Sequence, residues 1–157
     1  MTAEMLREAT PADREAIERL VEAAYGMYVD RIGKRPAPMD ADYAALIAAG
    51  LVTVAERDGA PAGILVLVPM PDHLLVENVA VDPAAQGSGL GRVLMAHAED
   101  EARARGFSEL RLYTNEKMVE NVAWYPRLGY RETDRRIESG FARVFFAKTI
   151  EISGAAA

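Results

Sequence analysis

Residues 74–98 read LLVENVAVDPAAQGSGLGRVLMAHA, and this stretch decides the fold of the chain. The first part, Leu74–Val81, is mostly apolar and rich in valine, a composition typical of a strand buried on both faces. Residues 82–88 form a loop opened by Asp-Pro and rich in small residues. Apolar residues then recur at helical spacing, at Leu90, Val93, Leu94 and Ala98. The stretch therefore predicts a strand, a glycine-rich loop and a helix that begins at Gly89 or Leu90.

A junction of this kind is typical of an anion site. The first N–H groups of a helix have no partner within the helix, and the helix dipole adds partial positive charge there. Glycines let the backbone approach a ligand that a Cβ atom would hold away. We therefore expect a phosphate or pyrophosphate to bind this loop, whose residues are Gln86, Gly87, Ser88, Gly89, Leu90, Gly91 and Arg92.

The glycine spacing separates the known classes of phosphate loop. A dinucleotide fingerprint needs G-x-G-x-x-G, but its third glycine is missing after Gly87 and Gly89. A P-loop needs Gly-Lys-Ser/Thr at the helix start, and the loop has no lysine. A plain nucleotide-binding α/β domain is therefore disfavoured.

Two motifs resemble the hallmarks of the GNAT superfamily of N-acetyltransferases. Gln86-x-x-Gly89-x-Gly91 is similar to the acetyl-coenzyme A (acetyl-CoA) signature Q/R-x-x-G-x-G/A of that family. Downstream, a predicted strand leads to Asn115, and a helix then carries the ending Tyr125-x-x-x-Gly129-Tyr130, similar to the family's second hallmark. The two motifs occupy residues 74–130 in the order that the family shows.

The resemblance implies an α/β (α+β) fold of the GNAT type in a single domain, residues 1–157. That fold has a mixed central sheet of about seven strands flanked by four helices, in the order β-α-α-β-β-β-α-β-α-β-β. Periodicity and turn signals agree with this order. They predict strands at residues 5–9, 51–56, 62–68, 74–81, 109–113, 131–136 and 143–150, and a frayed tail from Ser153.

The N-terminal part of the chain predicts two helices and a cationic loop. Thr10 is a typical N-cap, and apolar residues at helical spacing continue this helix through Tyr28. Glycine and proline then mark residues 31–38 as a loop with three cations. Asp40 is predicted to cap a second helix that ends at Gly50.

Tyr125 is the candidate general acid, because the resemblance places it near the coenzyme A sulfur. A departing thiolate has a conjugate pKa of about 8.5, and a tyrosine near 10 holds a proton that it can deliver at neutral pH. The alternative is that Tyr125 is a core aromatic residue. Pro126 directly follows and removes a helical N–H, so a kink could displace the phenol.

Glu77 is the candidate general base. An acid inside the apolar run is costly unless it is paired or functional, and a partly desolvated carboxylate can take a proton from an ammonium group, directly or through water. By strand alternation it shares a face with Val79 and Val81. A structural ion pair explains such acids equally well. His73, at the start of the same strand, is the alternative base.

The resemblance also implies backbone contacts to acetyl-CoA. In the family, two strands splay apart, and the central strand, here Val79, Ala80 and Val81, bonds the pantetheine arm as an added strand would. A backbone N–H near Val79 would polarise the thioester carbonyl. Asn115 and Asn121 are candidates for polar contacts to the arm, although Asn121 could instead be a helix N-cap.

The acceptor is not identified by the sequence, because the family's first seventy residues vary with the substrate. Tyr28 and Arg31, at the predicted loop, are candidate acceptor contacts. The loop cations favour an acceptor with a carboxylate or another anion, since arginine binds such groups in a bidentate manner. A solvated surface loop is the simpler interpretation.

Composition limits the other functions. The net charge is −6, with 18 basic and 24 acidic residues, so we expect no nucleic-acid partner. The longest apolar run is far too short for a membrane span and no signal peptide is recognisable, so we expect a cytoplasmic protein without a membrane partner. No metal is expected. Exposed strand edges in the C-terminal hairpin would suit a homodimer.

These observations favour an acyltransferase that moves the acetyl group of acetyl-CoA directly to a primary amine of a small molecule or peptide, in a ternary complex. The chain has no cysteine to carry a covalent intermediate. The alternative is a coenzyme A-binding sensor or regulatory module that has lost turnover.

Overall fold

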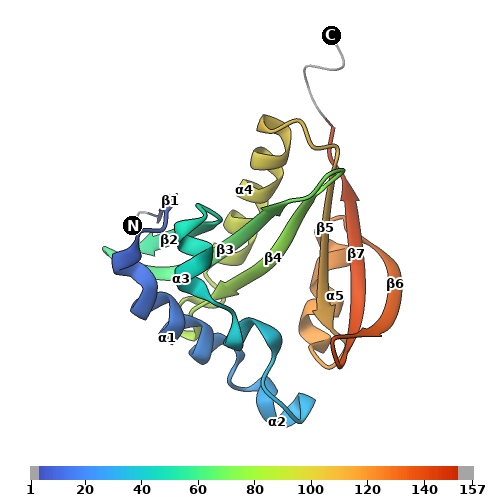
Figure 1. The fold of residues 1–157 in the computed structure, drawn as a ribbon, viewed down its shortest axis with the longest axis horizontal. Helices are drawn as coiled ribbons and strands as arrows, with labels where there is room; N and C mark the ends of the chain where they lie inside the picture. Colours follow the sequence, from blue (N-terminus) through green and yellow to red (C-terminus); the bar gives the residue numbers. More distant parts are fainter. Residues whose placement is uncertain (1–3, 152–157) are drawn as a thin grey trace. The chain divides into compact units, whose positions relative to one another are not determined.

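The computed structural model describes residues 4–151, so the tail predicted from Ser153 lies outside the described residues. Figure 1 shows the arrangement of the helices and strands. In chain order they are β1 (Glu4–Glu8), α1 (Arg14–Tyr25), α2 (Tyr28–Ile32), α3 (Tyr43–Ala48), β2 (Val52–Arg57), β3 (Ala60–Pro69), β4 (Leu74–Val81), α4 (Leu90–Ala104), β5 (Glu109–Asn115), α5 (Val119–Arg127), β6 (Arg131–Glu138) and β7 (Phe141–Thr149).

The strands form one seven-stranded sheet in the order β1-β2-β3-β4-β5-β7-β6. β4 and β5 run parallel, while β1–β2, β2–β3, β5–β7 and β6–β7 are antiparallel pairs. The predicted mixed sheet and its strand order along the chain are therefore confirmed. No predicted strand end is displaced by more than two residues.

The chain divides into two compact units. Among the described residues, unit 1 contains 4–67 and 78–97, and unit 2 contains 68–77 and 98–151. In unit 1, α1 and α3 lie in front of β2 and β3, and α4 lies behind them (Figure 1). No helix in the described part of the chain is long and apolar enough to cross a membrane.

The first predicted helix is divided in two, which is a correction to the sequence prediction. Thr10 precedes a 3-10 turn, Pro11–Asp13, and the α-helix proper begins at Arg14. α1 ends before Gly26, a poor helix former, and the short helix α2 follows. It ends at Gly33, whose φ of 89° is the left-handed conformation that terminates helices. The structure therefore has five α-helices within residues 4–151, where the sequence predicted four, and α2 is the additional one.

The cap of α3 is a second correction. Asp42, not Asp40, is the N-cap, and its side chain accepts a 3.0 Å hydrogen bond from the Ala45 N–H. Asp40 ends a 3-10 turn, Ala37–Asp40, and its carboxylate accepts a 2.9 Å hydrogen bond from Arg35 Nε. Two aspartates lie within three residues of each other, and only the backbone path decides which one faces the helix.

β4 has the predicted bounds but not the predicted burial. Its fully buried residues alternate with half-buried ones, so the strand is not buried on both faces. The half-buried set is Leu75, Glu77, Val79 and Val81. The apolar composition of the strand concealed this alternation, because half-buried valines are as frequent as buried ones.

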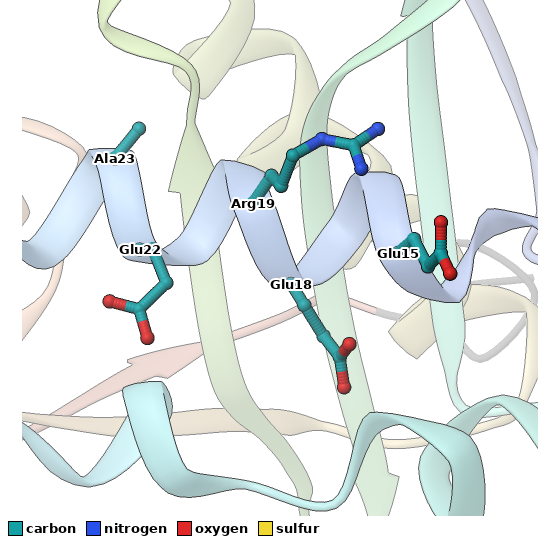
Figure 2. Close-up of a pocket in the computed structure, with 5 residues that line it drawn as sticks. All are labelled: Glu15, Glu18, Arg19, Glu22 and Ala23. Carbon is teal, nitrogen blue, oxygen red and sulfur yellow. The ribbon is translucent and has the colours of Figure 1, made fainter.

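The outer side of α1 carries an open, acidic hollow. Figure 2 shows the side chains that line it, which are Glu15, Glu18, Arg19, Glu22 and Ala23. Two of these carboxylates are engaged, Glu18 with Arg14 at 3.2 Å and Glu22 with Arg35 at 2.7 Å. None of the residues that the sequence predicts for the site lines this hollow.

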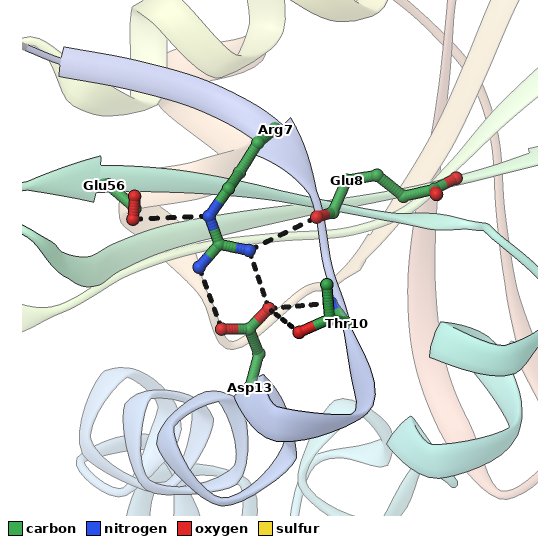
Figure 3. Close-up of polar contacts among 5 residues, drawn as sticks. All are labelled: Arg7, Glu8, Thr10, Asp13 and Glu56. Atoms are coloured by element: carbon green, nitrogen blue, oxygen red, sulfur yellow. Dashed lines mark hydrogen bonds and ion pairs between the residues drawn. The ribbon is translucent and has the colours of Figure 1, made fainter.

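A partly buried ion pair joins β1 to the turn before α1 (Figure 3). The Arg7 guanidinium binds the Asp13 carboxylate through two hydrogen bonds of 2.7 and 2.9 Å, and its Nε lies 3.3 Å from Glu56 on β2. The Thr10 N–H donates to the same carboxylate at 2.7 Å. The Arg7 hydrogen bonds, aided by the Thr10 N–H, lower the pKa of Asp13 to about 2.

This pair predicts a specific loss of stability in acid. Because the folded pKa of Asp13 lies below its ordinary value of 3.8, the stabilisation is present above pH 4 and is lost as the pH falls toward 2. We expect Asp13→Asn to lower the free energy of unfolding by about 2 kcal/mol at neutral pH. Urea unfolding between pH 2 and 7 measures it.

The matched control is Asp100→Asn, whose carboxylate is 76% exposed in an ion pair with Arg103. Exposed pairs contribute little, so this control should change stability by less than about 1 kcal/mol. Equal stability losses in the two variants would contradict the assignment of the acid transition to Asp13.

Candidate functional site

The loop after β4 is held by its own backbone and polar side chains. Asp82 accepts a 2.9 Å hydrogen bond from the Ala84 N–H and caps a 3-10 turn, Pro83–Ala85. Ala85 is buried, which anchors the turn to unit 1. Gln86 is exposed, and its side-chain amide lies 3.4 Å from the Val81 carbonyl oxygen at the end of the strand. The loop is therefore fixed at both ends.

Gly87 and Gly89 give the loop its path. Their φ angles are 83° and 87°, in the left-handed region that favours glycine. A Cβ atom added at either position would meet no atom within 4 Å, so the space beside the loop is open. Ser88, between them, is exposed and donates from Oγ to the Ala85 carbonyl. An anion can reach the backbone N–H groups of this segment.

The loop ends at the N-terminus of α4. The first hydrogen bond of this helix runs from the Val93 N–H to the Gly89 carbonyl, at 3.1 Å. The N–H groups of Leu90, Gly91 and Arg92 precede it and have no helical partner. Arg92 is exposed at this end of the helix. The structure therefore has the donors, the dipole and the open space that a pyrophosphate group requires.

Gly63, which the sequence analysis did not select, seats α4 on the sheet. A Cβ atom at this position of β3 would lie 3.0 Å from Leu94 Cδ1 and 3.2 Å from Leu90 Cδ2. Any side chain would require these leucines to shift, so the glycine favours the close approach of the first turns of α4 to the strand. The sequence feature that could have identified Gly63 is its position inside an apolar strand, where a glycine indicates a close approach of another element.

Asn78 is a second residue that the sequence analysis missed. It is 6% exposed, and its Oδ1 accepts a 2.6 Å hydrogen bond from the Tyr25 hydroxyl of α1. Its Nδ2 donates to the Tyr43 hydroxyl of α3 at 3.0 Å, and Tyr43 donates to the Pro38 carbonyl at 2.6 Å. The Tyr25 hydroxyl also lies 3.3 Å from the Val79 carbonyl oxygen. This network ties α1, α3 and the Pro38 turn to β4 in unit 1.

In unit 2, the Glu77 carboxylate contacts Tyr113 on β5. The Tyr113 hydroxyl donates to Glu77 Oε1 at 3.1 Å, and both residues are half-buried. Burial and the neighbouring Glu77 charge raise the pKa of Tyr113 to about 12. His73 precedes β4, four strand residues or about 13 Å from Glu77. Its Nδ1 lies 2.7 Å from the exposed Asp72 carboxylate.

Tyr125 is placed by an aromatic cluster in unit 2. Its side chain is buried, with the residue 5% exposed, and its ring centroid lies 5.6 Å from Phe146 on β7 and 5.9 Å from Tyr130. The ring of Tyr125 is therefore part of the core, as the alternative interpretation of the sequence stated. A buried tyrosine usually keeps its hydroxyl hydrogen-bonded, so the ring packing does not exclude a role for the phenol.

The end of α5 fixes the position of Tyr125 despite Pro126. The helix continues only to Arg127, and the Tyr125 carbonyl accepts hydrogen bonds from the Leu128 and Tyr130 N–H groups at 3.0 and 3.1 Å. Lys148 Nζ donates to the Leu128 carbonyl at 2.8 Å, which caps the negative end of the helix. Proline in the last turn removes only one helical hydrogen bond, to the Val122 carbonyl, and the contacts beyond it close the end of the helix.

The two candidate asparagines have structural partners in unit 2. Asn115 Oδ1 accepts from the Lys117 N–H at 2.9 Å and closes the turn after β5. Asn121 is not the N-cap of its helix, because α5 begins at Val119 with Met118 as the cap. Its side chain points back, with Nδ2 3.4 Å from Thr114 Oγ1. The helix starts earlier than the sequence predicts, because the Asn115 turn directs the chain into the helix before Asn121 is reached.

The acceptor candidates lie together at α2 in unit 1. The Arg31 guanidinium lies 5.0 Å from the centre of the Tyr28 ring, a cation–π contact. Arg31 is in the helix and exposed, and Tyr28 is 8% exposed. Arg35 pairs with both Glu22 and Asp40, so its charge is compensated within the fold. The loop is therefore less cationic than its sequence indicates.

Comparison with known proteins identifies the family of this arrangement. The model of the acetyltransferase (GNAT) family matches residues 14–130, which includes the loop, α4, β5 and α5. The chain belongs to the GNAT family. The match includes residues of both units, as the GNAT motifs in the sequence do.

Two named acetyltransferases illustrate the similarity in sequence. The chain is 34% identical over 80 residues to the ribosomal protein bS18-alanine N-acetyltransferase of Escherichia coli K12, a match covering 51% of this chain and 54% of that protein. It is 40% identical over 58 residues to the streptothricin acetyltransferase of Streptomyces lavendulae, covering 37% of this chain and 31% of that protein. The chain thus spans about half of the first GNAT relative and less of the second.

A solved structure shows the GNAT fold over nearly the whole chain. The PaiA N-acetyltransferase of Thermoplasma acidophilum, in complex with coenzyme A, superposes with a TM-score of 0.78. The superposition covers 94% of this chain and 99% of that one, at 15% sequence identity. At this identity the likeness establishes the fold alone.

The Asn78 network predicts a large cost for a substitution of similar volume. Asn78→Leu removes the acceptor of the Tyr25 hydroxyl and the donor to Tyr43, and it leaves two buried hydroxyls with fewer partners. We expect the free energy of unfolding to fall by about 1–3 kcal/mol. Denaturant unfolding of the two proteins measures the loss.

Asn121→Leu is the matched control, because within residues 4–151 that amide makes only contacts of 3.4 Å and longer. Its loss should be well under 1 kcal/mol, since long contacts contribute little. A control that loses as much stability as Asn78→Leu would mean that the network does not stabilise β4.

Proposed function

We propose that the chain is an acetyl-CoA-dependent N-acetyltransferase that moves the acetyl group directly to a primary amine in a ternary complex. Its membership of the GNAT family supports this function. The observation that carries the proposal is the open Gly87–Gly89 backbone at the N-terminus of α4. The absence of cysteine from the sequence favours direct transfer over a cysteine-bound acetyl intermediate. We further propose that both units belong to one catalytic domain.

In unit 1, the proposed role of the loop is to hold the pyrophosphate of acetyl-CoA. The backbone N–H groups of Gly87, Gly89, Leu90 and Gly91 are the proposed donors, and the exposed Arg92 adds positive charge. The backbone of Val79, Ala80 and Val81 is assigned to the pantetheine arm. Acetyl-CoA, when bound, supplies an acetyl group on a thioester.

In unit 2, Glu77 is proposed as the general base. Its carboxylate is half-buried and has one oxygen bonded to Tyr113, which leaves the other oxygen able to accept a proton from the acceptor amine. It lies two residues from Val79 along β4, about 7 Å. His73 is a poorer candidate, because it precedes the strand and lies next to an exposed carboxylate.

Tyr125 is proposed as the general acid. The contacts at the end of α5 hold its backbone, and the packing of Phe146 and Tyr130 holds its ring. A phenol in a fixed position can deliver a proton to the departing sulfur without moving through the solvent. Asn115 and Asn121 are proposed contacts to the pantetheine arm, in addition to their structural bonds.

The acceptor is proposed to be an amine on a small molecule or peptide. The two GNAT relatives act, by their names, on the alanine of a ribosomal protein and on streptothricin. Proteins similar in sequence to this chain therefore use both kinds of acceptor. Tyr28 and Arg31 are proposed acceptor contacts. A homodimer through β6 is a further proposal, because this strand is at the sheet edge and exposed along nearly its whole length.

The cofactor assignment predicts the effect of one substitution in the loop. Gly89→Asp adds a negative side chain where the pyrophosphate is expected and strains a residue with a φ of 87°. We expect acetyl-CoA binding, measured by calorimetry, to weaken by at least about 100-fold, as expected for a lost anion site with added charge repulsion.

Gly59→Asp is the matched control. Gly59 has a φ of 80° and open space around a Cβ atom, but it lies in the turn between β2 and β3. The control carries the same strain and the same charge, and it should bind acetyl-CoA as the wild type does. If the two variants bind equally, the loop does not hold the pyrophosphate.

The general-acid assignment predicts a pH-dependent loss of turnover. Tyr125→Phe keeps the ring and its packing, so the fold and acetyl-CoA binding should persist. We expect kcat to fall by about 10²–10⁴-fold at neutral pH, the usual contribution of a positioned acid. The loss should shrink at high pH, where the thiolate leaves without a proton. Pre-steady-state release of free thiol measures the rates.

Tyr130→Phe is the matched control, because the Tyr130 hydroxyl is buried without a hydrogen-bond partner among the described residues. It should keep wild-type turnover. Equal rates for wild type and Tyr125→Phe would remove Tyr125 from the mechanism. Binding of acetyl-CoA without turnover by the wild type, for any amine, would favour a sensor instead.

A further inference from the structure

Tyr113 is the residue of unit 2 that contacts the proposed base. It pairs with Phe145 in the register of β5 and β7, and its neighbour Leu112 pairs with Phe146. Since Phe146 packs on Tyr125 of α5, strand alternation places Tyr113 and Phe145 on the opposite face of these strands from α5. From that face the Tyr113 hydroxyl donates to Glu77 Oε1 at 3.1 Å.

The Tyr113 ring is held by two neighbours. The Arg143 guanidinium lies 4.2 Å from the ring centre, and the Phe145 ring lies 5.7 Å away, tilted by 51°. The Arg143 side chain is only 9% exposed, and its Nη1 donates to Glu138 at 2.7 Å. A cation over the ring and an aromatic partner beside it restrict the ring, so the direction of the hydroxyl is set by packing.

The hydroxyl is a donor at every physiological pH. Burial and the nearby Glu77 charge raise the pKa of Tyr113 to about 12, so the phenol stays protonated. A neutral O–H that donates to a carboxylate stabilises the ionised form of that carboxylate. One Glu77 oxygen is thereby occupied, and the other, which has no hydrogen bond within residues 4–151, remains to accept a proton.

We propose that Tyr113 is a positioning residue for the reaction, which orients the Glu77 carboxylate and keeps it ionised. Arg143 acts behind it by fixing the ring. The inference rests on the proposed function, since it takes Glu77 as the general base. The proton of the acceptor ammonium passes to the unoccupied Glu77 oxygen, directly or through water, and Tyr113 keeps its own proton throughout.

The charges around Glu77 within unit 2 are few. On β5, Arg111 precedes Tyr113 by two residues, and its guanidinium is engaged by Glu109 and by Asp72. On β7 and β6, Arg143 and Glu138 form an ion pair, so their effects on Glu77 oppose each other. The residues of β3 that belong to unit 2, Val68 and Pro69, have no titratable side chain. The Tyr113 hydroxyl is thus the group in direct contact with the Glu77 carboxylate.

The test is the pH profile of kcat/KM for Tyr113→Phe. This variant keeps the ring under Arg143 and removes only the hydrogen bond. Loss of a donor raises the pKa of Glu77, so the acidic limb of the profile should move to higher pH by about one unit. Activity should therefore fall about tenfold below the limb and return to near the wild-type rate above it.

Three outcomes separate the inference from the proposed function. A limb that moves in Tyr113→Phe and disappears in Glu77→Gln supports both. A limb that disappears in Glu77→Gln but stays in place in Tyr113→Phe overturns the role of Tyr113 and keeps Glu77 as the base. A profile unchanged by Glu77→Gln removes the base assignment and the inference together. Tyr130→Phe, which removes a hydroxyl without a partner among the described residues, should leave the limb in place.

A titration that needs no turnover gives an independent readout. Carbon NMR of the Glu77 side-chain carboxyl, assigned by its loss in Glu77→Gln, reports its pKa in the wild type and in Tyr113→Phe. We expect the value to be about one unit higher in the variant. An unchanged titration in a folded Tyr113→Phe protein would overturn the proposal, whatever the activity.

Discussion

The candidate loop depends on the close packing of α4 against β3 at Gly63. A side chain there would approach Leu94 and Leu90 of α4 to 3.0 and 3.2 Å, and the Ala80 carbonyl of β4 to 3.2 Å. These distances are shorter than ordinary van der Waals contacts, so the glycine lets the first turns of α4 lie close to the sheet. The N-terminus of the helix therefore follows β4 after a short loop, and its unpaired N–H groups are brought to the end of the central strand.

β4 carries two adjacent polar residues with different surroundings. Asn78 is buried, and its amide is satisfied by tyrosines of α1 and α3. A buried amide with such partners fixes the strand, because breaking the bonds costs the desolvation of each group. Glu77 is half-buried, and one of its oxygens accepts the hydrogen bond from the Tyr113 hydroxyl. Within the described part of the chain its other oxygen has no hydrogen bond, so it remains an open acceptor.

The sequence predicted the elements whose signals are local. The glycine pattern after Leu74–Val81 located the loop and the start of α4 correctly, because backbone conformations with positive φ need glycine at particular positions. Gly129, predicted at the end of α5, has a φ of 95° for the same reason. Prediction failed where neighbouring residues compete for one role. Asp40 and Asp42 are both good caps, and propensity does not show which one meets the first turn of α3.

By itself, the sequence determined the family, the order of the strands along the chain and the position of the glycine loop before α4, since the signals for each are local in the chain. Only the tertiary structure decided the partners of the polar residues. Glu77 and Tyr113 are 36 positions apart, and Tyr25 and Asn78 are 53 apart. Such pairs depend on strand register and helix packing, which are set by the whole core, so no local pattern predicts that Glu77 contacts Tyr113 while the neighbouring Asn78 contacts Tyr25 and Tyr43.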